Sequence, residues 1–379
     1  MRCSPSLVSV FVLAWFAAAH CQVQSVPAET HLPLRVGIVG LVHGHVQGFL
    51  QQSLHSPEIE IVGIVEPDRQ LASQYAKQYG FDQHLLFSDL EEMLKQTHPQ
   101  AVLVYTNTYD HRRVVEICAQ HGVHVMMEKP LAVSFEDAVA IEKAAHLGKI
   151  QVLVNYETTW YASNRAAYDL VHEKALGEVR KVVVHDGHRG PKEIGVGPEF
   201  LSWLTDPKLN GAGALFDFGC YGADLMTWLM DGARPETVTA VTQQIKPDVY
   251  PRVDDEATII LTYPKAQAIV QASWNWPFDR KDMEVYGQKG YVVTVRRDDI
   301  RVRRNGGGSG QDSREEQVAA KPLAAPYDNS LSYLRAVVVN GMKPDGPSSL
   351  DINLTVTEIL DAARRSAVSG KTIRLPASK

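Results

Sequence analysis

The sequence predicts two consecutive folds: an α/β domain with a parallel sheet, then an α+β domain with an open, largely antiparallel sheet. The chain has 379 residues, which is long for one hydrophobic core and favours two domains. Apolar strand patterns alternate with helix patterns up to about residue 152, as in parallel sheets with crossover helices. Beyond that point strand patterns follow one another with few helices between them, which indicates an antiparallel sheet.

The composition is that of a globular protein and excludes some classes of partner. Hydrophobic residues make up 45% of the chain and charged residues 22%. The formal net charge is −6, whereas a protein that binds nucleic acid needs a basic surface, so no nucleic-acid partner is expected. The four cysteines do not suggest a disulfide framework. Two lie in or beside the N-terminal segment, and we expect the other two, Cys118 and Cys220, to be free thiols.

Residues 1–21 have the pattern of a signal peptide. Arg2 is the only charge before the apolar run 7–19, and alanines at 17–19 offer a cleavage site. A buried N-terminal helix is the alternative, but a polar stretch separates the run from the first strand. We therefore expect an exported protein, periplasmic or secreted, with no membrane span because neither this run nor any later one is long enough. Lipoprotein anchoring is not expected, because histidine before Cys21 fits a lipoprotein cleavage site poorly.

The first half, residues 33–152, carries the pattern of a dinucleotide-binding domain. Residues 34–40 read as a buried strand that runs into a glycine turn, and a helix pattern follows. A second strand, residues 59–65, ends at Glu66 about twenty residues after the loop. This order is that of a Rossmann-type domain, in which helix-terminal amides face the pyrophosphate and the acid binds the ribose hydroxyls. A carboxylate here repels a 2′-phosphate and favours NAD over NADP, although Arg69 could reverse that preference.

The glycine loop departs from the usual fingerprint. After Gly40, the second and third glycine positions hold Val42 and His45, and Gly44 is displaced by one. A side chain at Val42 is expected to hold the pyrophosphate further off or to force another path on the loop. We expect Gly40, Val42, His43 and His45 to contact the cofactor.

Helices and strands continue to alternate after Glu66. The expected helices are 71–79, 88–95 and 114–121, and the expected strands are 101–105 and 124–127. Thr106, Asn107 and His111 lie just past a strand's carboxyl end, where open α/β sheets bind ligands, so they are candidate cofactor contacts. For Asn107 and His111 the alternatives are a turn former and a helix-start residue.

Residues 153–349 are expected to form the second, substrate-binding domain, and residues 350–379 a C-terminal helix and tail. After a strand at 152–154 and a helix at 163–172, strands dominate the pattern. They are expected at 179–185, 238–243, 257–263, 268–274, 282–287 and 291–295. An edge hairpin near 301–304 leads into an exposed glycine-rich loop at 306–310.

Two motifs carry the expected chemistry. Glu128-Lys129-Pro130 closes the nucleotide half. In the other half, small residues at 211–214 open a helix on which Asp217 and Tyr221, four residues apart, share a face. Together the motifs supply an ammonium, a carboxylate and a phenol. These groups can take a proton from a sugar hydroxyl while a nicotinamide takes the hydride.

On these motifs, and from about residue 34 to the C-terminus, the chain resembles the Gfo/Idh/MocA oxidoreductases, the family of glucose–fructose oxidoreductase and inositol dehydrogenase. The resemblance implies that Lys129 is catalytic, that it and Glu128 border the nicotinamide, and that the Lys129–Pro130 peptide bond is cis. Tyr221 stands where inositol dehydrogenase-like members have histidine, as in the glucose–fructose oxidoreductase and dihydrodiol or xylose dehydrogenase branches. The resemblance also implies that the C-terminal helix packs back toward the nucleotide domain, and that the protein is a homo-oligomer, a dimer or a tetramer.

The expected catalytic residues are therefore Lys129, Asp217 and Tyr221. Asn155, His188, Asp217 and Tyr221 are the candidate substrate contacts. A neighbouring ammonium is expected to lower the pKa of Tyr221, and burial to lower that of Lys129. Which of the two moves the proton stays open. The histidine pairs at 43/45 and 185/188 lack a companion cysteine, so no metal site is expected.

These residues predict an NAD(P)-dependent oxidoreductase that acts on a CH–OH group of a sugar, a glycoside or a related polyol. Because no free NAD pool is expected outside the cytoplasm, an exported enzyme must hold its nicotinamide tightly. The alternative is an NAD-dependent glycosidase that works through a transient keto-sugar by oxidation, elimination and re-reduction. A third interpretation, made plausible by the altered glycine loop, is a binding protein that has lost activity.

Overall fold

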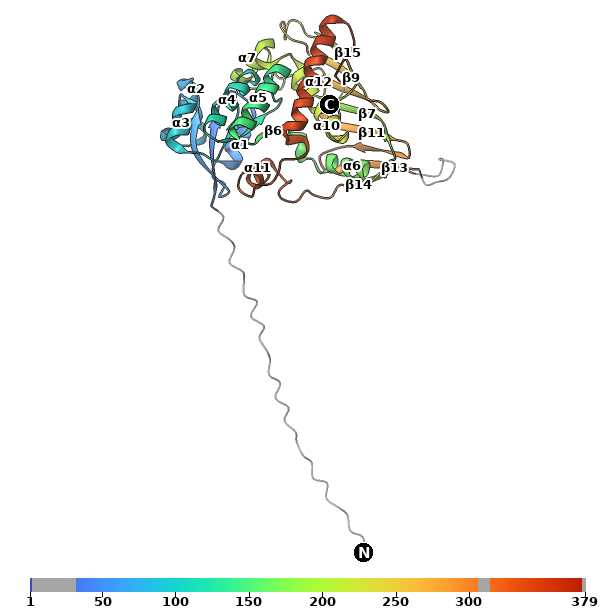
Figure 1. Ribbon diagram of the computed structural model, residues 1–379, viewed down its shortest axis with the longest axis horizontal. Coiled ribbons are helices and arrows are strands. Elements are labelled where there is room, and N and C mark those ends of the chain that lie inside the picture. Colours follow the sequence, from blue (N-terminus) through green and yellow to red (C-terminus); the bar gives the residue numbers. More distant parts are fainter. Residues whose placement is uncertain (2–31, 306–313, 377–379) are drawn as a thin grey trace. The chain divides into compact units, whose positions relative to one another are not determined.

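The computed structural model describes Met1 and residues 32–305 and 314–376 (Figure 1). The predicted signal peptide, with Cys3 and Cys21, and the glycine-rich loop at 306–310 lie outside these residues, so export stays a prediction. Within the described ranges, no helix is long and apolar enough to cross a membrane. Contacts join Pro33–Lys379 into one unit.

The nucleotide half is built on a sheet of six strands, all parallel, in the order β3-β2-β1-β4-β5-β6. The strands are β1 (Leu34–Val39), β2 (Ile59–Val65), β3 (Leu86–Phe87), β4 (Ala101–Val104), β5 (His124–Glu128) and β6 (Val152–Asn155). Most of their side chains are buried, which explains their continuous apolar runs. The order reverses between β1 and β4, and ligands bind at such a point in open α/β sheets.

Helices connect these strands, as the sequence predicts for an α/β domain. They are α1 (His45–Ser53), α2 (Arg69–Tyr79), α3 (Leu90–Thr97), α4 (His111–Gln120) and α5 (Phe135–Gly148), with short 3₁₀ turns η1 (Gln83–Leu85) and η2 (Thr108–Asp110). The sequence patterns predicted α2 and α3 within a few residues, but they missed α5. The predicted Rossmann-type fold of this half is confirmed.

The second half is built on a nine-stranded sheet, in the order β14-β13-β12-β11-β7-β10-β9-β8-β15. All neighbouring strands are antiparallel except β7 and β10. The strands are β7 (Val179–Gly187), β8 (Thr237–Gln243), β9 (Glu256–Thr262), β10 (Gln267–Ser273), β11 (Arg280–Gly287), β12 (Gly290–Thr294), β13 (Asp299–Arg304), β14 (Glu316–Ala319) and β15 (Ile373–Arg374). The predicted open, largely antiparallel sheet is confirmed.

The helices of this half carry the second motif and the link to the first half. They are η3 (Glu157–Trp160), α6 (Ala162–His172), α7 (Pro198–Leu204), α8 (Pro207–Asn210), α9 (Ala214–Asp217), α10 (Gly219–Leu229), α11 (Ser330–Val338), η4 (Gly346–Ser348) and α12 (Leu350–Ser369). Every residue of α10 is buried, and α10 packs against β7, β10 and α12. Helix α12 contacts α10 and β8 on one side and α5 and β6 on the other (Figure 1).

Hydrophobic packing joins the two halves. One cluster of buried side chains contains Val125 and Val154 of the first sheet, Val184 and Val270 of the second, and Leu360 of α12. Cys118 and Cys220 are buried free cysteines, as predicted. Because both halves share this core, side chains from either half are held in fixed positions where they meet.

Candidate active site

The turn after β1 has room only for glycine at its first position. Gly40 has a φ of +86°, and a Cβ there would lie 2.8 Å from the backbone nitrogen of Thr106. Its N–H donates to the Val65 carbonyl at 2.8 Å, which ties the turn to the neighbouring strand. Thr106 itself is half-buried, and its hydroxyl donates to the Asn107 carbonyl. The turn therefore needs a residue that adopts a positive φ without a side chain.

The rest of the loop is covered by α7 of the other half. The His43 ring is 2% exposed and lies 4.8 Å from the Phe200 ring and 5.5 Å from the Trp203 ring, between centroids. The Trp203 indole donates to the Val42 carbonyl at 3.2 Å, and the Val42 side chain packs against the hydrophobic core. Burial holds the pKa of His43 well below its usual range, so the ring is neutral.

Glu66 braces this loop, a role that the sequence did not reveal. Its carboxylate accepts the Leu41 N–H at 2.9 Å and the Asp68 N–H at 3.0 Å. Burial raises its pKa above the usual value, in spite of these two hydrogen bonds. The side chain also lines a cavity of about 490 Å³ together with Arg69.

These features fit a dinucleotide: a glycine-only turn, an α1 N-terminus with no side-chain cap, and an acid beside a cavity at the end of β2.

Asn107 caps η2 by accepting the Asp110 N–H, and His111 is 1% exposed, with its Nδ1 3.1 Å from the Pro130 carbonyl oxygen. Asn107 thus acts as a turn former and His111 as a helix-start residue, the alternatives to cofactor contact that the sequence left open. For His111, little surface is left for a ligand, and burial lowers its pKa to about 4.

Glu128 lies at the centre of a hydrogen-bond chain between the halves. Its carboxylate is 2.9 Å from Nδ1 of His45 and accepts the Asn155 amide at 3.0 Å. The Asn155 carbonyl oxygen in turn accepts the Trp160 indole at 3.0 Å. Burial alone would raise the pKa of Glu128, but His45 and Asn155 outweigh it and lower the pKa to about 2. Glu128 is therefore a buried anion, and the amide of Asn155 is already engaged at both ends.

Lys129 and Asp217 meet as a buried ion pair. The Lys129 ammonium donates to Oδ1 of Asp217 at 2.5 Å and to its backbone carbonyl at 2.9 Å. The Trp274 indole donates to the other carboxylate oxygen at 2.9 Å. The Lys129–Pro130 peptide bond is cis, as the resemblance implied. Residues 88 positions apart in the chain thus form one unit at the junction of the halves.

Tyr221 lies beside this pair. The Lys129 Nζ is 5.0 Å from the centroid of its ring, and the Lys281 Nζ is 4.9 Å away. The sequence-based pKa expectations for these groups were wrong. Burial raises the pKa of Tyr221 well above its usual value. Burial alone would lower the pKa of Lys129, but Asp217 outweighs that effect and raises it. The resting site therefore holds an ammonium, a carboxylate and a neutral phenol.

Arg364 of α12 connects the two loops that carry the motifs. One of its terminal nitrogens donates to the carbonyls of Val133 and Gly211, each at 3.1 Å. The first of these follows the Lys129–Pro130 turn, and the second opens the small-residue turn before Asp217. No local sequence signal indicates this contact, because Arg364 lies 231 and 153 positions away from its partners.

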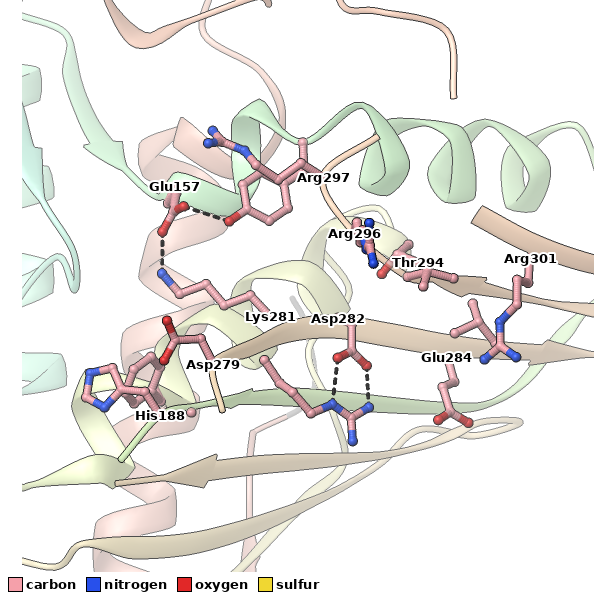
Figure 2. A pocket seen from close by; sticks show the side chains of 16 residues that line it. Glu157, His188, Asp279, Lys281, Asp282, Glu284, Thr294, Arg296, Arg297 and Arg301 are labelled. Carbon is pink, nitrogen blue, oxygen red and sulfur yellow. Dashed lines mark hydrogen bonds and ion pairs between the residues drawn. The ribbon is translucent and has the colours of Figure 1, made fainter. Parts of the chain in front are cut away.

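A cavity of about 600 Å³ (Figure 2) includes in its wall Phe218, whose ring centroid lies 5.9 Å from Lys129 Nζ. It is lined by Phe218, which follows Asp217, by Lys281 and by His188. The His188 ring packs edge-on against Phe218, with 4.8 Å between centroids, and burial lowers its pKa. The volume is within the range of small-molecule sites, roughly 300–1,000 Å³. Of the predicted substrate residues, His188 lines this cavity, whereas Asn155, Asp217 and Tyr221 are not among its lining residues.

The cavity wall contains charged residues that the sequence analysis did not single out. Glu157 of η3 forms an ion pair with Lys281 and accepts the Tyr161 hydroxyl at 2.7 Å. These contacts outweigh burial and lower the pKa of Glu157 to about 2. The charges belong to segments that are not adjacent in the chain, so no motif could reveal them.

The expectation that there is no metal site stays a prediction. His43, His45 and Glu128 each offer one ligand atom, and these atoms lie within 4.8 Å of one another. In the structure described here the carboxylate of Glu128 is engaged by His45 and Asn155 instead. The pair His185 and His188 is divided: His185 lies 3.2 Å from Asp282, whereas His188 accepts the Gly190 N–H.

The fold and the site define a two-domain nicotinamide-dependent oxidoreductase. Residues 34–156 match the family model described as the oxidoreductase family with an NAD-binding Rossmann fold, and residues 164–293 match the GFO/IDH/MocA C-terminal domain. The chain belongs to the Gfo/Idh/MocA oxidoreductase family, and its first half is an NAD-binding domain.

Among curated proteins, the chain is similar to trans-1,2-dihydrobenzene-1,2-diol dehydrogenases. It is 26% identical to the enzyme of Xenopus tropicalis over 222 residues, which cover 58% of this chain and 63% of that protein. It is 23% identical to the human enzyme over 235 residues, which cover 62% of this chain and 66% of that protein. The matches thus span less than two thirds of these relatives.

Solved structures share the fold over nearly the whole chain. Aldose–aldose oxidoreductase from Caulobacter crescentus is 24% identical, with a TM-score of 0.74, and the match covers 90% of this chain and 100% of that one. An inositol dehydrogenase homologue with bound NAD⁺ from Azotobacter vinelandii is 18% identical, with a TM-score of 0.76, and the match covers 92% and 98%. At this identity the likeness concerns the fold, and the expected homo-oligomer stays a prediction.

Proposed function

We propose that this protein is an NAD-dependent dehydrogenase that oxidises a secondary hydroxyl group of a sugar, a glycoside or a related polyol, and that it is exported. One observation carries the proposal. Lys129 and Asp217 form a buried ion pair, and Lys129 Nζ lies 5.0 Å from the ring centroid of Tyr221 and 5.9 Å from that of Phe218, which lines a cavity large enough for a sugar. Bound NAD supplies the hydride acceptor. The residues of the chain must then bind the alcohol and move its proton.

The ion pair provides a route for that proton. The Lys129 ammonium lies 2.5 Å from a carboxylate oxygen of Asp217, so it can pass one proton to Asp217 and accept another from the substrate hydroxyl. After this exchange Lys129 is again an ammonium and stabilises the oxygen from which the proton left. In the reduction direction the same ammonium donates a proton to the carbonyl oxygen of the substrate. The protonated Asp217 then returns a proton to Lys129.

Tyr221 has a different role in this scheme. Because burial raises its pKa, the phenol stays neutral and acts as a hydrogen-bond donor to the reacting oxygen. Of the two candidates for proton transfer, we assign the step to Lys129, because its ammonium already contacts a proton acceptor, Asp217.

Purified protein tests the proposal directly. Mass spectrometry of the protein as isolated should detect retained NAD, and a screen of sugars and glycosides should give a change in absorbance at 340 nm. Lys129→Met should abolish turnover, and Tyr221→Phe should reduce it. Lys143→Met is the matched control, because Lys143 is exposed on α5 and should leave activity unchanged.

Two results would contradict the proposal: full activity in Lys129→Met and Tyr221→Phe, or retained NAD that no sugar, glycoside or polyol reduces. Product analysis separates the remaining alternative. A keto-sugar that keeps its aglycone supports a dehydrogenase, whereas released aglycone with no net change of the cofactor supports the NAD-dependent glycosidase.

A further inference from the structure

The charges that line the cavity are mostly neutralised by one another. Glu157 is paired with Lys281, and Asp282 accepts two hydrogen bonds from Arg280, at 2.7 and 2.8 Å. Glu284 accepts the hydroxyl of Tyr286. These pairs leave few charges of the wall available to a ligand.

Within the described ranges, four charged residues of the wall form no ion pair: the acids Asp279 and Glu284 and, together on one turn, Arg296 and Arg297. Arg296 and Arg297 line the cavity from the turn between β12 and β13, and neither forms an ion pair in the described part of the chain, although Arg297 is near enough to Glu157 to help lower its pKa. Figure 2 shows both arginines above Lys281, whereas Asp279 lies beside His188 below it. The cavity therefore has a basic end at the turn, on the other side of Lys281 from Asp279.

Arg297 is held in place although it is exposed. Its guanidinium carbon lies 4.7 Å from the centroid of the Tyr161 ring. Its backbone carbonyl accepts the Ser163 N–H at 2.9 Å, which ties the turn to the start of α6. A guanidinium that stacks on a ring and forms no ion pair can offer its planar set of N–H donors to a bound group.

We propose that this basic end binds an anionic group carried by the sugar substrate, so that the enzyme prefers acidic sugars such as uronic acid glycosides. The inference rests on the proposed function. A planar carboxylate matches the arginine fork and accepts two parallel hydrogen bonds. With that carboxylate at Arg296 and Arg297, the rest of the sugar occupies the cavity, whose wall includes Lys281, with its Nζ 4.9 Å from the centroid of the Tyr221 ring. A sulfate ester offers the same charge, so the test includes both groups.

The test compares three methyl glucosides that differ at one position: the neutral sugar, its 6-carboxylate (the glucuronide) and its 6-sulfate. At low ionic strength we expect kcat/KM to be roughly tenfold or more higher for an anionic substrate, a typical size for a charged hydrogen bond. The anionic substrate with the larger increase in kcat/KM over the neutral sugar, the carboxylate or the sulfate, identifies the anionic group that the site binds. High salt should raise KM for the anionic substrates alone, because the arginines are exposed and screened.

Variants connect the preference to the arginines. Arg297→Gln should remove the preference by raising KM for the anionic substrates, with the neutral sugar unchanged, and Arg296→Gln should act in the same direction. Arg304→Gln is the matched control. It removes the same charge from an exposed position on β13 that does not line the cavity, so it should keep the preference.

Equal kcat/KM for neutral and anionic substrates would overturn the inference while the dehydrogenase proposal stands. An equal loss for all three substrates in Arg297→Gln would also overturn it. Calorimetric binding of the glucuronide separates the two proposals if no sugar is oxidised. Binding that Arg297→Gln weakens supports the anionic site although the dehydrogenase fails, and absence of binding rejects the site.

Discussion

The Trp274 indole donates a hydrogen bond of 2.9 Å to the carboxylate oxygen of Asp217 that Lys129 leaves free. The ammonium and the indole therefore fix both oxygens of one buried carboxylate. Asp217 cannot rotate without breaking a charge-assisted hydrogen bond, so the geometry of the proton route is set before the substrate arrives.

Trp274→Phe should lower kcat/KM by roughly tenfold to a hundredfold, the size of one hydrogen bond to a charged group. The bond from Trp274 helps to lower the pKa of Asp217, so its loss should raise that pKa. The acid limb of the pH–rate profile should then move to higher pH. Trp276→Phe is the comparison, because its indole makes no hydrogen bond in the described part of the chain; an identical pH profile in Trp274→Phe would contradict the assignment.

Glu128→Gln tests the buried anion. The pKa of Glu128 is depressed from 4.5 to about 2, so the charge contributes to stability above pH 4.5, and this contribution is lost as the pH falls toward 2. The variant should unfold at lower urea concentration than the wild type at pH 7, and the difference should shrink between about pH 4.5 and pH 2. A difference that does not depend on pH would show that the charge is not the cause.

Glu66 should decide both cofactor choice and loop stability. Wild-type protein is expected to bind NAD more tightly than NADP, because an anion beside the ribose repels a 2′-phosphate. Glu66→Gln should weaken NAD binding and reduce the preference, whereas Arg69→Gln should leave NAD binding nearly unchanged and weaken NADP binding. Titration calorimetry with both cofactors measures this, and a tighter NADP complex in the wild type would reverse the assignment.

Gly40→Ala should destabilise the protein and abolish NAD binding. The backbone has a φ of +86° and a Cβ would lie 2.8 Å from the Thr106 nitrogen, which together cost about 1–3 kcal/mol or more. Gly48→Ala is the matched control on the neighbouring helix. Nothing lies within 4 Å of its Cβ position, so alanine should stabilise α1 by about 1 kcal/mol. Thermal unfolding with and without NAD distinguishes the two variants.

The sequence predicted those parts of the site that are encoded locally. Lys129 precedes a proline after a strand, and Asp217 and Tyr221 are one helical turn apart, so both motifs could be recognised without knowledge of the fold. Trp274 and Arg364 could not be predicted, because their partners lie 57 positions away or more. The pKa directions of Lys129 and Tyr221 were wrong because they depend on the ion pair and on burial, which only the structure shows.

The prediction of secondary structure also succeeded only where the local sequence pattern is strong. Strands with continuous apolar runs were predicted well, but helix α5 was missed. Its buried face is made mainly of Ala138, Ile141 and Ala145, and alanine gives a weak hydrophobic pattern. The signal that could have located its start is Ser134, which accepts the Asp137 N–H as an N-cap.

Arg364, in the last helix of the chain, contacts both loops that carry the reacting groups. During synthesis the nucleotide half and most of the sheet leave the ribosome before this helix exists. The two loops therefore acquire their common anchor only after α12 has been synthesised, and a chain that stops before residue 350 lacks it. The contact that joins the two loops is thus supplied by α12, which is made after both of them.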